Sequence, residues 1–231
     1  MSDEWWAKPR RVSVVVDNES WILGHAQDLV EALNRAGDRA ALCRDHADIG
    51  EGAVAFFLGC VHIAGPRVLA LNRRNLVVHA SDLPRGRGFS PLTWQILEGR
   101  DRIPVCLFEA VAEADAGPVV YRDHLDFEGH ELIGEMRAAQ GEMTVALCLR
   151  FMDEAAPPAG APQEGEPSAY PRRTPEDSRL DPDATIARQF GLLRVVDNAR
   201  YPAYFDLKGQ RYRITIEKTG PAGDDSDESD G

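Results

Sequence analysis

Residues 75–99 read NLVVHASDLPRGRGFSPLTWQILEG, and this stretch decides the fold. Residues 75–78 contain three consecutive apolar side chains and predict a buried strand that ends at His79. A loop with two glycines and two arginines follows, and Ser90-Pro91 then predicts the start of a helix that stops at Gly99. The pattern therefore places a histidine at the carboxyl end of a strand. That position suits catalysis, although a lone histidine more often has a structural role.

The alternation of strands and helices extends along the first 150 residues or so. The expected strands cover residues 11–16, 40–43, 53–58, 103–108 and 118–121, and the expected helices follow Ser20, open at Pro66 and span 129–151. This order predicts an α/β fold with a mostly parallel sheet and helices on both faces. Ligands of such sheets bind outside the carboxyl ends of the strands, which points to the segments after Val78 and Phe108.

The composition changes after residue 152, the expected end of the main domain. Residues 153–182 are rich in Pro, Gly, Ala and Glu and predict a loop-rich linker. Residues 183–218 predict a short helix over 183–190 and then a small β-hairpin that turns at Lys208-Gly209. Residues 219–231 contain acidic residues and no basic ones, which predicts a disordered tail. The hairpin edge can pair with a second copy of the chain, as a homodimer.

The charge balance argues against two classes of partner. The chain has 231 residues, with 26 Lys plus Arg, 38 Asp plus Glu and a formal net charge of -12. Binding to nucleic acid is favoured when basic side chains release counterions from the phosphates, so we expect no binding of this acidic chain to nucleic acid. An acidic surface also does not favour binding to anionic membranes. The sequence lacks the long apolar run of a membrane-spanning helix. The start, MSDEWWAKPRR, lacks the apolar core of a signal peptide, so we expect a cytoplasmic protein.

The cysteines and histidines predict no metal centre. The cysteines at positions 43, 60, 106 and 148 lie in separate apolar runs and are expected to be reduced, mostly buried thiols. His25, His46 and His62 each stand alone in the sequence, and His124 and His130 have no nearby cysteine. We therefore expect no structural zinc.

The stretch around His79 resembles a known signature. The matching pieces, in order, are His79, Ser81, Leu83-Pro84, Arg87-Gly88, Pro91, Trp94 and Asp115-Ala116-Gly117, with Asp115 36 positions after His79. They resemble the formyltransferases that use N10-formyltetrahydrofolate. The resemblance extends over about residues 12–151 and implies a formyltransferase-type, Rossmann-like fold. It also implies an enzyme whose formyl donor is N10-formyltetrahydrofolate.

Three further segments narrow the resemblance. Residues 16–22, 170–182 and 190–205 are similar to bacterial formyltransferases acting on nucleotide-linked amino sugars. The nearest branch formylates the 4-amino group of a UDP-linked 4-amino-4,6-dideoxy sugar on the pseudaminic-acid type of pathway. Methionyl-tRNA formyltransferase adds a larger C-terminal domain that helps to hold tRNA, for which this acidic chain has no room. Glycinamide ribonucleotide or a peptidyl amine as acceptor, and a non-catalytic module that binds folate or a nucleotide sugar, stay open as alternatives.

The resemblance implies roles for individual residues. His79 is the implied donor or acid–base group, and Asp115 is the partner that holds it. Contacts to the formyl donor are implied for Ser81, Leu83, Pro84, Arg87, Gly88 and Gly117. Contacts to the nucleotide sugar are expected for Asp17, Asn18, Ser20, Trp21, Arg172, Arg173, Arg194 and Asn198. Most of these residues also have a structural interpretation: Ser81 as a loop hydrogen bond, Ser20 as a helix cap, Trp21 in the core, and the arginines on the surface.

One position departs from the family pattern. The family has an asparagine two residues before the histidine, where this chain has Val77, which offers no hydrogen-bond donor. Asn75 shares a strand face with His79, but four residues at about 3.3 Å each place it about 13 Å away. We expect a backbone N–H of the loop 84–88, or another side chain, to stabilise the oxyanion instead.

Overall fold

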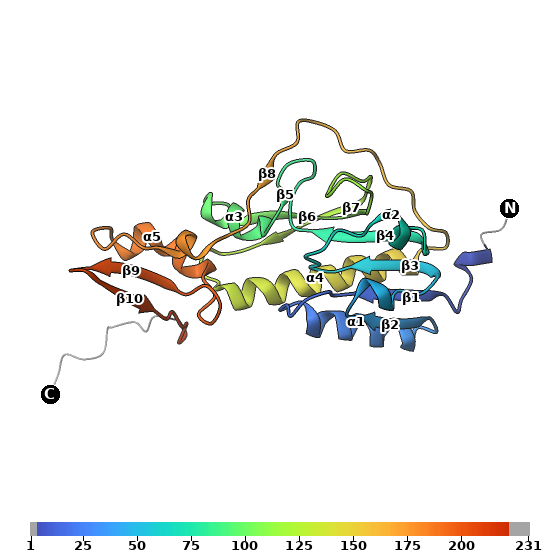
Figure 1. Cartoon of the computed structure of the whole chain (residues 1–231), viewed down its shortest axis with the longest axis horizontal. Coiled ribbons are helices and arrows are strands. Elements are labelled where there is room, and N and C mark those ends of the chain that lie inside the picture. Colours follow the sequence, from blue (N-terminus) through green and yellow to red (C-terminus); the bar gives the residue numbers. More distant parts are fainter. Residues whose placement is uncertain (1–3, 222–231) are drawn as a thin grey trace. The chain divides into compact units, whose positions relative to one another are not determined.

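The computed structural model describes residues 4–221, and the chain divides into two compact units, Met1–Arg173 and Thr174–Gly231. The first unit is built on a six-stranded sheet of order β2-β1-β3-β4-β6-β7 (Figure 1). Its strands are β1 Arg11–Val15, β2 Arg39–Cys43, β3 Gly52–Phe57, β4 Asn72–His79, β6 Arg102–Glu109 and β7 Val119–Asp126. The first four run parallel, which confirms the predicted mostly parallel α/β sheet.

Strand β6 departs from the parallel pattern. It runs antiparallel to β4, with His79 opposite Cys106 and Leu76 opposite Glu109, and β7 runs antiparallel to β6. The carboxyl ends of β4 and β6 therefore point to opposite edges of the sheet, so the rule for parallel strands does not apply to the end of β6. The connection from β6 to β7 instead folds back toward β4, which brings it to His79.

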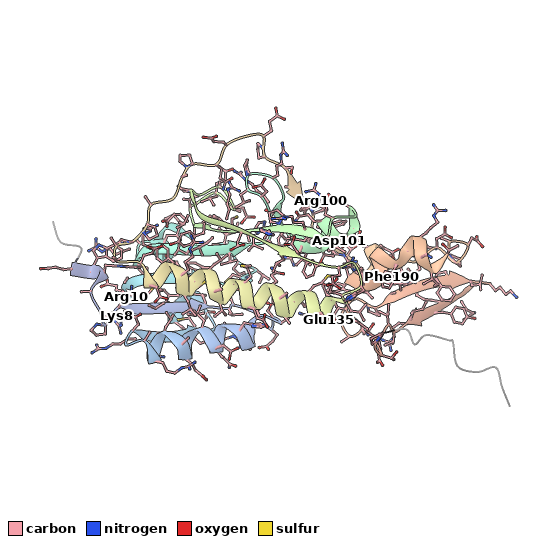
Figure 2. The ribbon with its side chains drawn as sticks, turned by 180° about the vertical axis from the view of Figure 1, so that it is seen from behind. Lys8, Arg10, Arg100, Asp101, Glu135 and Phe190 are labelled. Carbon is pink, nitrogen blue, oxygen red and sulfur yellow. The ribbon has the colours of Figure 1, made fainter. Side chains whose placement is uncertain are left out.

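Helices cover both faces of the sheet, because successive side chains of a strand point to opposite sides. On one face α1 (Leu23–Arg35) and α4 (Ile133–Asp153) contact each other (Figure 2). There Phe56 of β3 meets Phe151 of α4 with ring centroids 6.3 Å apart. On the other face the neighbouring Phe57 packs in a cluster with side chains of α2 (Pro66–Leu69). The alternation of buried side chains along β3 thus places apolar layers on both sides.

The helix after the glycine-rich loop is α3, Pro91–Leu97. Its Gln95 amide is buried and donates a 2.7 Å hydrogen bond to the carbonyl of Ala80, directly after β4. Gly99 follows with φ +82, a left-handed conformation that glycine adopts without strain, so the predicted stop is present. This contact fixes α3 to the strand end that bears His79.

The Pro-rich stretch after α4 is mostly irregular, but parts of it form β-pairs with other segments of the first unit. Ala161 bridges to Val119, and the two-residue strand β8 (Ala169–Tyr170) pairs with β5 (Arg87–Gly88). Residues 161–170 thus belong to the structure around β5 and β7. The first compact unit accordingly ends at Arg173, beyond the boundary expected from composition.

The second unit contains the predicted helix and hairpin. It includes the short 3-10 helix η3 (Pro175–Ser178), α5 (Ile186–Val195) and the antiparallel strands β9 (Ala203–Leu207) and β10 (Gln210–Ile214). Helix α5 is longer than predicted because apolar side chains continue to its end, where Leu193 joins a small core with Leu180, Val196 and Ala203. The predicted disordered tail falls mainly on residues 222–231, which lie outside the described residues.

Within residues 4–221, no helix combines the length and the apolar character that crossing a lipid bilayer requires.

Candidate active site

His79 is the last residue of β4 and lies at the centre of the candidate site. Its side chain is largely buried, and its ring meets Phe108 of β6 edge-on at a centroid distance of 6.4 Å. Asn75, two positions before Val77 on the same strand face, donates instead to the carbonyls of Leu69 and Asn72. Asn75 therefore serves the local backbone and does not substitute for the family asparagine.

Asp115 reaches His79 from the β6–β7 connection. Its Oδ2 lies 4.0 Å from His79 Nε2 and accepts a 2.8 Å hydrogen bond from the N–H of Gly88. The same His79 nitrogen lies 2.8 Å from the carbonyl oxygen of Gly86. The structure thus brings together the two residues to which the sequence assigned catalysis.

The contacts of His79 select a tautomer. Nε2 faces two acceptors, the Gly86 carbonyl and the Asp115 carboxylate, so the proton of the neutral ring belongs on Nε2. Nδ1 then carries the lone pair, and no hydrogen bond to it is formed among residues 4–221. The ring therefore offers Nδ1 as a proton acceptor, while Nε2 is held by the Gly86 carbonyl and the Asp115 carboxylate.

The backbone of Asp115 has an unusual conformation that is held by a side chain from another segment. Asp115 has φ +53, in the left-handed region that costs energy for most residues with a side chain. The Gln163 side-chain amide, from the Pro-rich stretch, donates at 2.8 Å to the carbonyl of Asp115 and at 2.8 Å to that of Gly117. The sequence analysis missed Gln163 because nothing near it resembles a motif.

Gly117 allows the connection to pass close to β6. A Cβ at this position would lie 1.8 Å from the carbonyl oxygen of Glu109. We expect Gly117→Ala to lower the free energy of unfolding by at least about 1–3 kcal/mol, the usual cost of overpacking. Urea denaturation of both proteins measures this difference.

Gly134→Ala is the matched control, because a Cβ there meets no atom within 4 Å and the residue lies in α4. Alanine in a helix is favoured over glycine by about 0.5–1 kcal/mol, so this variant should be as stable as the original chain or more so. Equal stability of the Gly117 and Gly134 variants would contradict the close approach described for Gly117.

The loop 84–88 has no N–H group left for an oxyanion. Pro84 lacks one, and the next four residues all donate: Arg85 to Asp82, Gly86 to Ser168 Oγ, Arg87 to the Ser168 carbonyl and Gly88 to Asp115. The expectation of a backbone donor in this loop was therefore wrong. The two bonds to Ser168 accompany the pairing of β5 with β8, which the composition of the Pro-rich stretch did not predict.

The expected formyl-donor residues surround the same loop. Leu83 is buried against Cys106, Phe108 and Val119, and Pro84 follows it through a cis peptide bond. Arg87 binds Glu113 at 2.7 Å and Gln163 at 3.0 Å. Ser81, two residues after His79, is 2% exposed, and its hydroxyl oxygen has no hydrogen-bond partner. Ser81 therefore keeps a free donor beside the histidine strand.

The residues after β1 form a tight turn with the segment after β3. Asp17 accepts hydrogen bonds of 2.9 Å from the Asn18 amide and from the backbone N–H groups of Val61 and His62. Burial alone would raise the pKa of the Asp17 carboxyl. The hydrogen bonds from Asn18, Val61 and His62, including the His62 ring, outweigh it and lower the pKa to about 2. Asp17 is therefore an ionised anchor of the 59–62 turn.

The other expected nucleotide-sugar residues lie in different places. Ser20 does not cap α1, whose N-cap is Ile22, so that structural interpretation was wrong; Trp21 is 36% exposed and contacts His25 edge-on. In the first unit the Arg172 guanidinium lies 4.5 Å over the Phe89 ring, and Arg173 is at its end. In the second unit Arg194 is buried on α5, and Asn198 bonds to the backbone of Ile216.

The fold is that of formyltransferases. No family model matches the sequence. The structure resembles methionyl-tRNA formyltransferase from Clostridium thermocellum, with a TM-score of 0.71 and 21% identity over 87% of this chain and 89% of that one. It also resembles HypX from Aquifex aeolicus in complex with tetrahydrofolic acid (TM-score 0.69, 16% identity, 88% of this chain and 37% of that one). A sugar N-formyltransferase from Shewanella matches at TM-score 0.63 and 14% identity, over 92% of this chain and 99% of that one.

Proposed function

We propose that the protein is a cytoplasmic enzyme that moves a formyl group from N10-formyltetrahydrofolate to a nucleotide-linked amino sugar. The acceptor is the 4-amino group of a UDP-linked 4-amino-4,6-dideoxy sugar, as in the pseudaminic-acid type of pathway. The observation that supports this most strongly is the approach of Asp115 to His79 at the end of β4, within a formyltransferase fold.

The similar structures support the two substrates in general terms. HypX was solved with tetrahydrofolic acid, and the Shewanella protein is a sugar N-formyltransferase. A methionyl-tRNA acceptor is disfavoured by the net charge of -12, because binding to RNA rewards basic surfaces. The residues expected at the formyl donor keep that role in the proposal, and the nucleotide sugar is assigned to the first-unit residues Asn18, Ser20, Trp21, Arg172 and Arg173.

The proposed reaction is acyl transfer between two nitrogens. The sugar amine attacks the formyl carbon, the carbonyl oxygen becomes an oxyanion, and the C–N10 bond then breaks to release tetrahydrofolate. His79 Nδ1 accepts the proton that the amine loses, and the protonated ring returns a proton to the leaving N10. The negative charge of Asp115, 4.0 Å from Nε2, stabilises the imidazolium that forms in between.

The oxyanion needs a donor in place of the family asparagine. Val77 has none, and the N–H groups of residues 85–88 are already bonded. The Ser81 hydroxyl is buried without a partner on the segment that follows His79. We assign Ser81 as the donor to the formyl oxygen, a role whose loss typically costs about 10²–10³ in rate.

A direct assay tests the proposed function. Purified chain is mixed with N10-formyltetrahydrofolate and, separately, with UDP-, dTDP- and GDP-linked 4-amino sugars, glycinamide ribonucleotide and methionyl-tRNA, and tetrahydrofolate release is followed. We expect turnover with a nucleotide-linked 4-amino sugar. Turnover only with glycinamide ribonucleotide or methionyl-tRNA would show that the proposed acceptor is wrong. Binding detected by calorimetry without turnover would favour a non-catalytic binding module, the alternative suggested by Val77.

A further inference from the structure

Three side chains of metal-ligand type converge at the sheet edge beside the first strands. Asp17 follows β1, His46 opens the short 3-10 helix η2 (His46–Asp48) after β2, and Cys60 follows β3. Their ligand atoms all lie within 4.8 Å of one another. Because β1 lies between β2 and β3 and all three run parallel, their carboxyl ends meet here. None of these residues belongs to the motif around His79.

His46 has an unused nitrogen that faces this cluster. Its Nε2 is buried without a hydrogen-bond partner and lies 3.8 Å from Asp17 Oδ2, too far for a hydrogen bond. The ring is held edge-on against Phe57 at 5.9 Å. A buried nitrogen without a partner costs free energy, and a cation at the centre of the cluster would satisfy it.

The ligand set matches a particular class of ion. One thiol, one imidazole and one carboxylate are the groups that bind Zn²⁺ and similar transition metals, with bonds of roughly 2.0–2.3 Å. Ligands of a tetrahedral site with such bonds are roughly 3.3–3.8 Å apart, so the present arrangement needs only small side-chain movements. A hard cation such as Mg²⁺ would prefer oxygen ligands throughout.

His62 lies next to Asp17 and His46 at the edge of the cluster. Its Nδ1 bonds to Asp17 Oδ2 at 2.9 Å, its ring is 6.5 Å from that of His46, and its side chain is 73% exposed. Carboxylates that bind a metal are themselves hydrogen-bonded by outer partners, and His62 is such a partner for Asp17. Because it is exposed, His62 can also turn to fill a fourth position.

We propose that Asp17, His46 and Cys60 bind one divalent transition-metal ion, best matched by Zn²⁺, with the fourth position open toward His62. No metal was expected from the sequence, because the three ligands come from separate segments and show no metal-ligand spacing along the chain. On binding, the Cys60 thiol releases its proton to solvent and the sulfur becomes a thiolate ligand. The site does not depend on the proposed formyl transfer.

Cobalt titration tests the site directly. The full chain, stripped of metal and kept reduced, is titrated with Co²⁺ and then with Zn²⁺ while the absorption spectrum is followed. We expect one Co²⁺ per chain, a thiolate-to-cobalt charge-transfer band and loss of that band as Zn²⁺ displaces Co²⁺. Loss of an outer partner alone costs about 10–100-fold in metal affinity, so Cys60→Ser and His46→Gln should each weaken Zn²⁺ binding by at least about 100-fold.

Two control variants separate this site from adventitious binding. Cys148→Ala removes a fully buried thiol on α4, and His130→Gln removes an exposed histidine beside Glu128, so both should keep the band and the affinity. Circular dichroism shows whether each variant is folded. Absence of the band in the folded original chain, or a band of full strength in Cys60→Ser, would overturn the proposal.

Discussion

We expect His79→Ala to reduce the proposed formyl transfer by about 10²–10⁴-fold, the contribution of a positioned acid–base group. The variant removes the nitrogen proposed to accept the amine proton, together with the ring that lies beside Asp115. The variant also loses the hydrogen bond between His79 and the Gly86 carbonyl, which contributes about 0.5–1.5 kcal/mol to the free energy of unfolding. Turnover at saturating substrates, together with thermal unfolding, separates the two effects.

His124→Ala is the control for a histidine outside the site. His124 lies on β7, is partly exposed and pairs with Asp126. This variant should keep the turnover of the original chain. A His79 variant that is as active as the His124 variant would remove His79 from the mechanism.

We expect Asp115→Asn to reduce the proposed turnover by about 10²–10³-fold while the loop stays in place. Two unit charges 4 Å apart attract by about 4 kcal/mol at an effective dielectric constant near 20, which sets the upper end of this range. Asparagine keeps an oxygen that accepts from the Gly88 N–H, and it tolerates the left-handed φ of +53 better than most residues. The substitution therefore removes the charge and little else.

Glu113→Gln is the matched control for Asp115. Glu113 is an exposed acid of the same connection and pairs with Arg87 across the solvent-facing side of the loop. We expect its removal to change turnover less than about twofold, because exposed ion pairs contribute at most about 1 kcal/mol. If the two variants lose activity equally, the loop itself matters and the charge of Asp115 does not.

The local elements of the sheet could be predicted from sequence, whereas the direction of β6 could not. The apolar runs at residues 11–16 and 53–58 and the stop at Gly99 act through short-range preferences that the sequence displays. Strand direction depends on long-range pairing, and an apolar run such as 103–108 has the same pattern in either direction. The return of the 110–118 connection to β4 was expected only through the resemblance, which pairs Asp115 with His79, and not from the pattern of strands.

The candidate site shows the same limit. His79 and Asp115 were found through a motif with fixed order. Gln163 and Ser168, which hold the two loops, lie in a Pro-rich stretch with no motif. Asp17, His46 and Cys60 belong to three different strand ends, so only the sheet order brings them together. Sequence patterns find neighbours along the chain, while such clusters are made by neighbours in space.

The pairing of residues 161–170 with β5 and β7 sets the shortest polypeptide in which the candidate site is held in place. A fragment that stops at residue 152 includes all six strands of the central sheet but lacks Gln163 and Ser168, which hold Asp115 and Gly86. During synthesis the sheet can therefore assemble before His79 and Asp115 are aligned. The contacts that align them form only when the ribosome has released the chain through about Tyr170, the residue of β8 opposite Gly88.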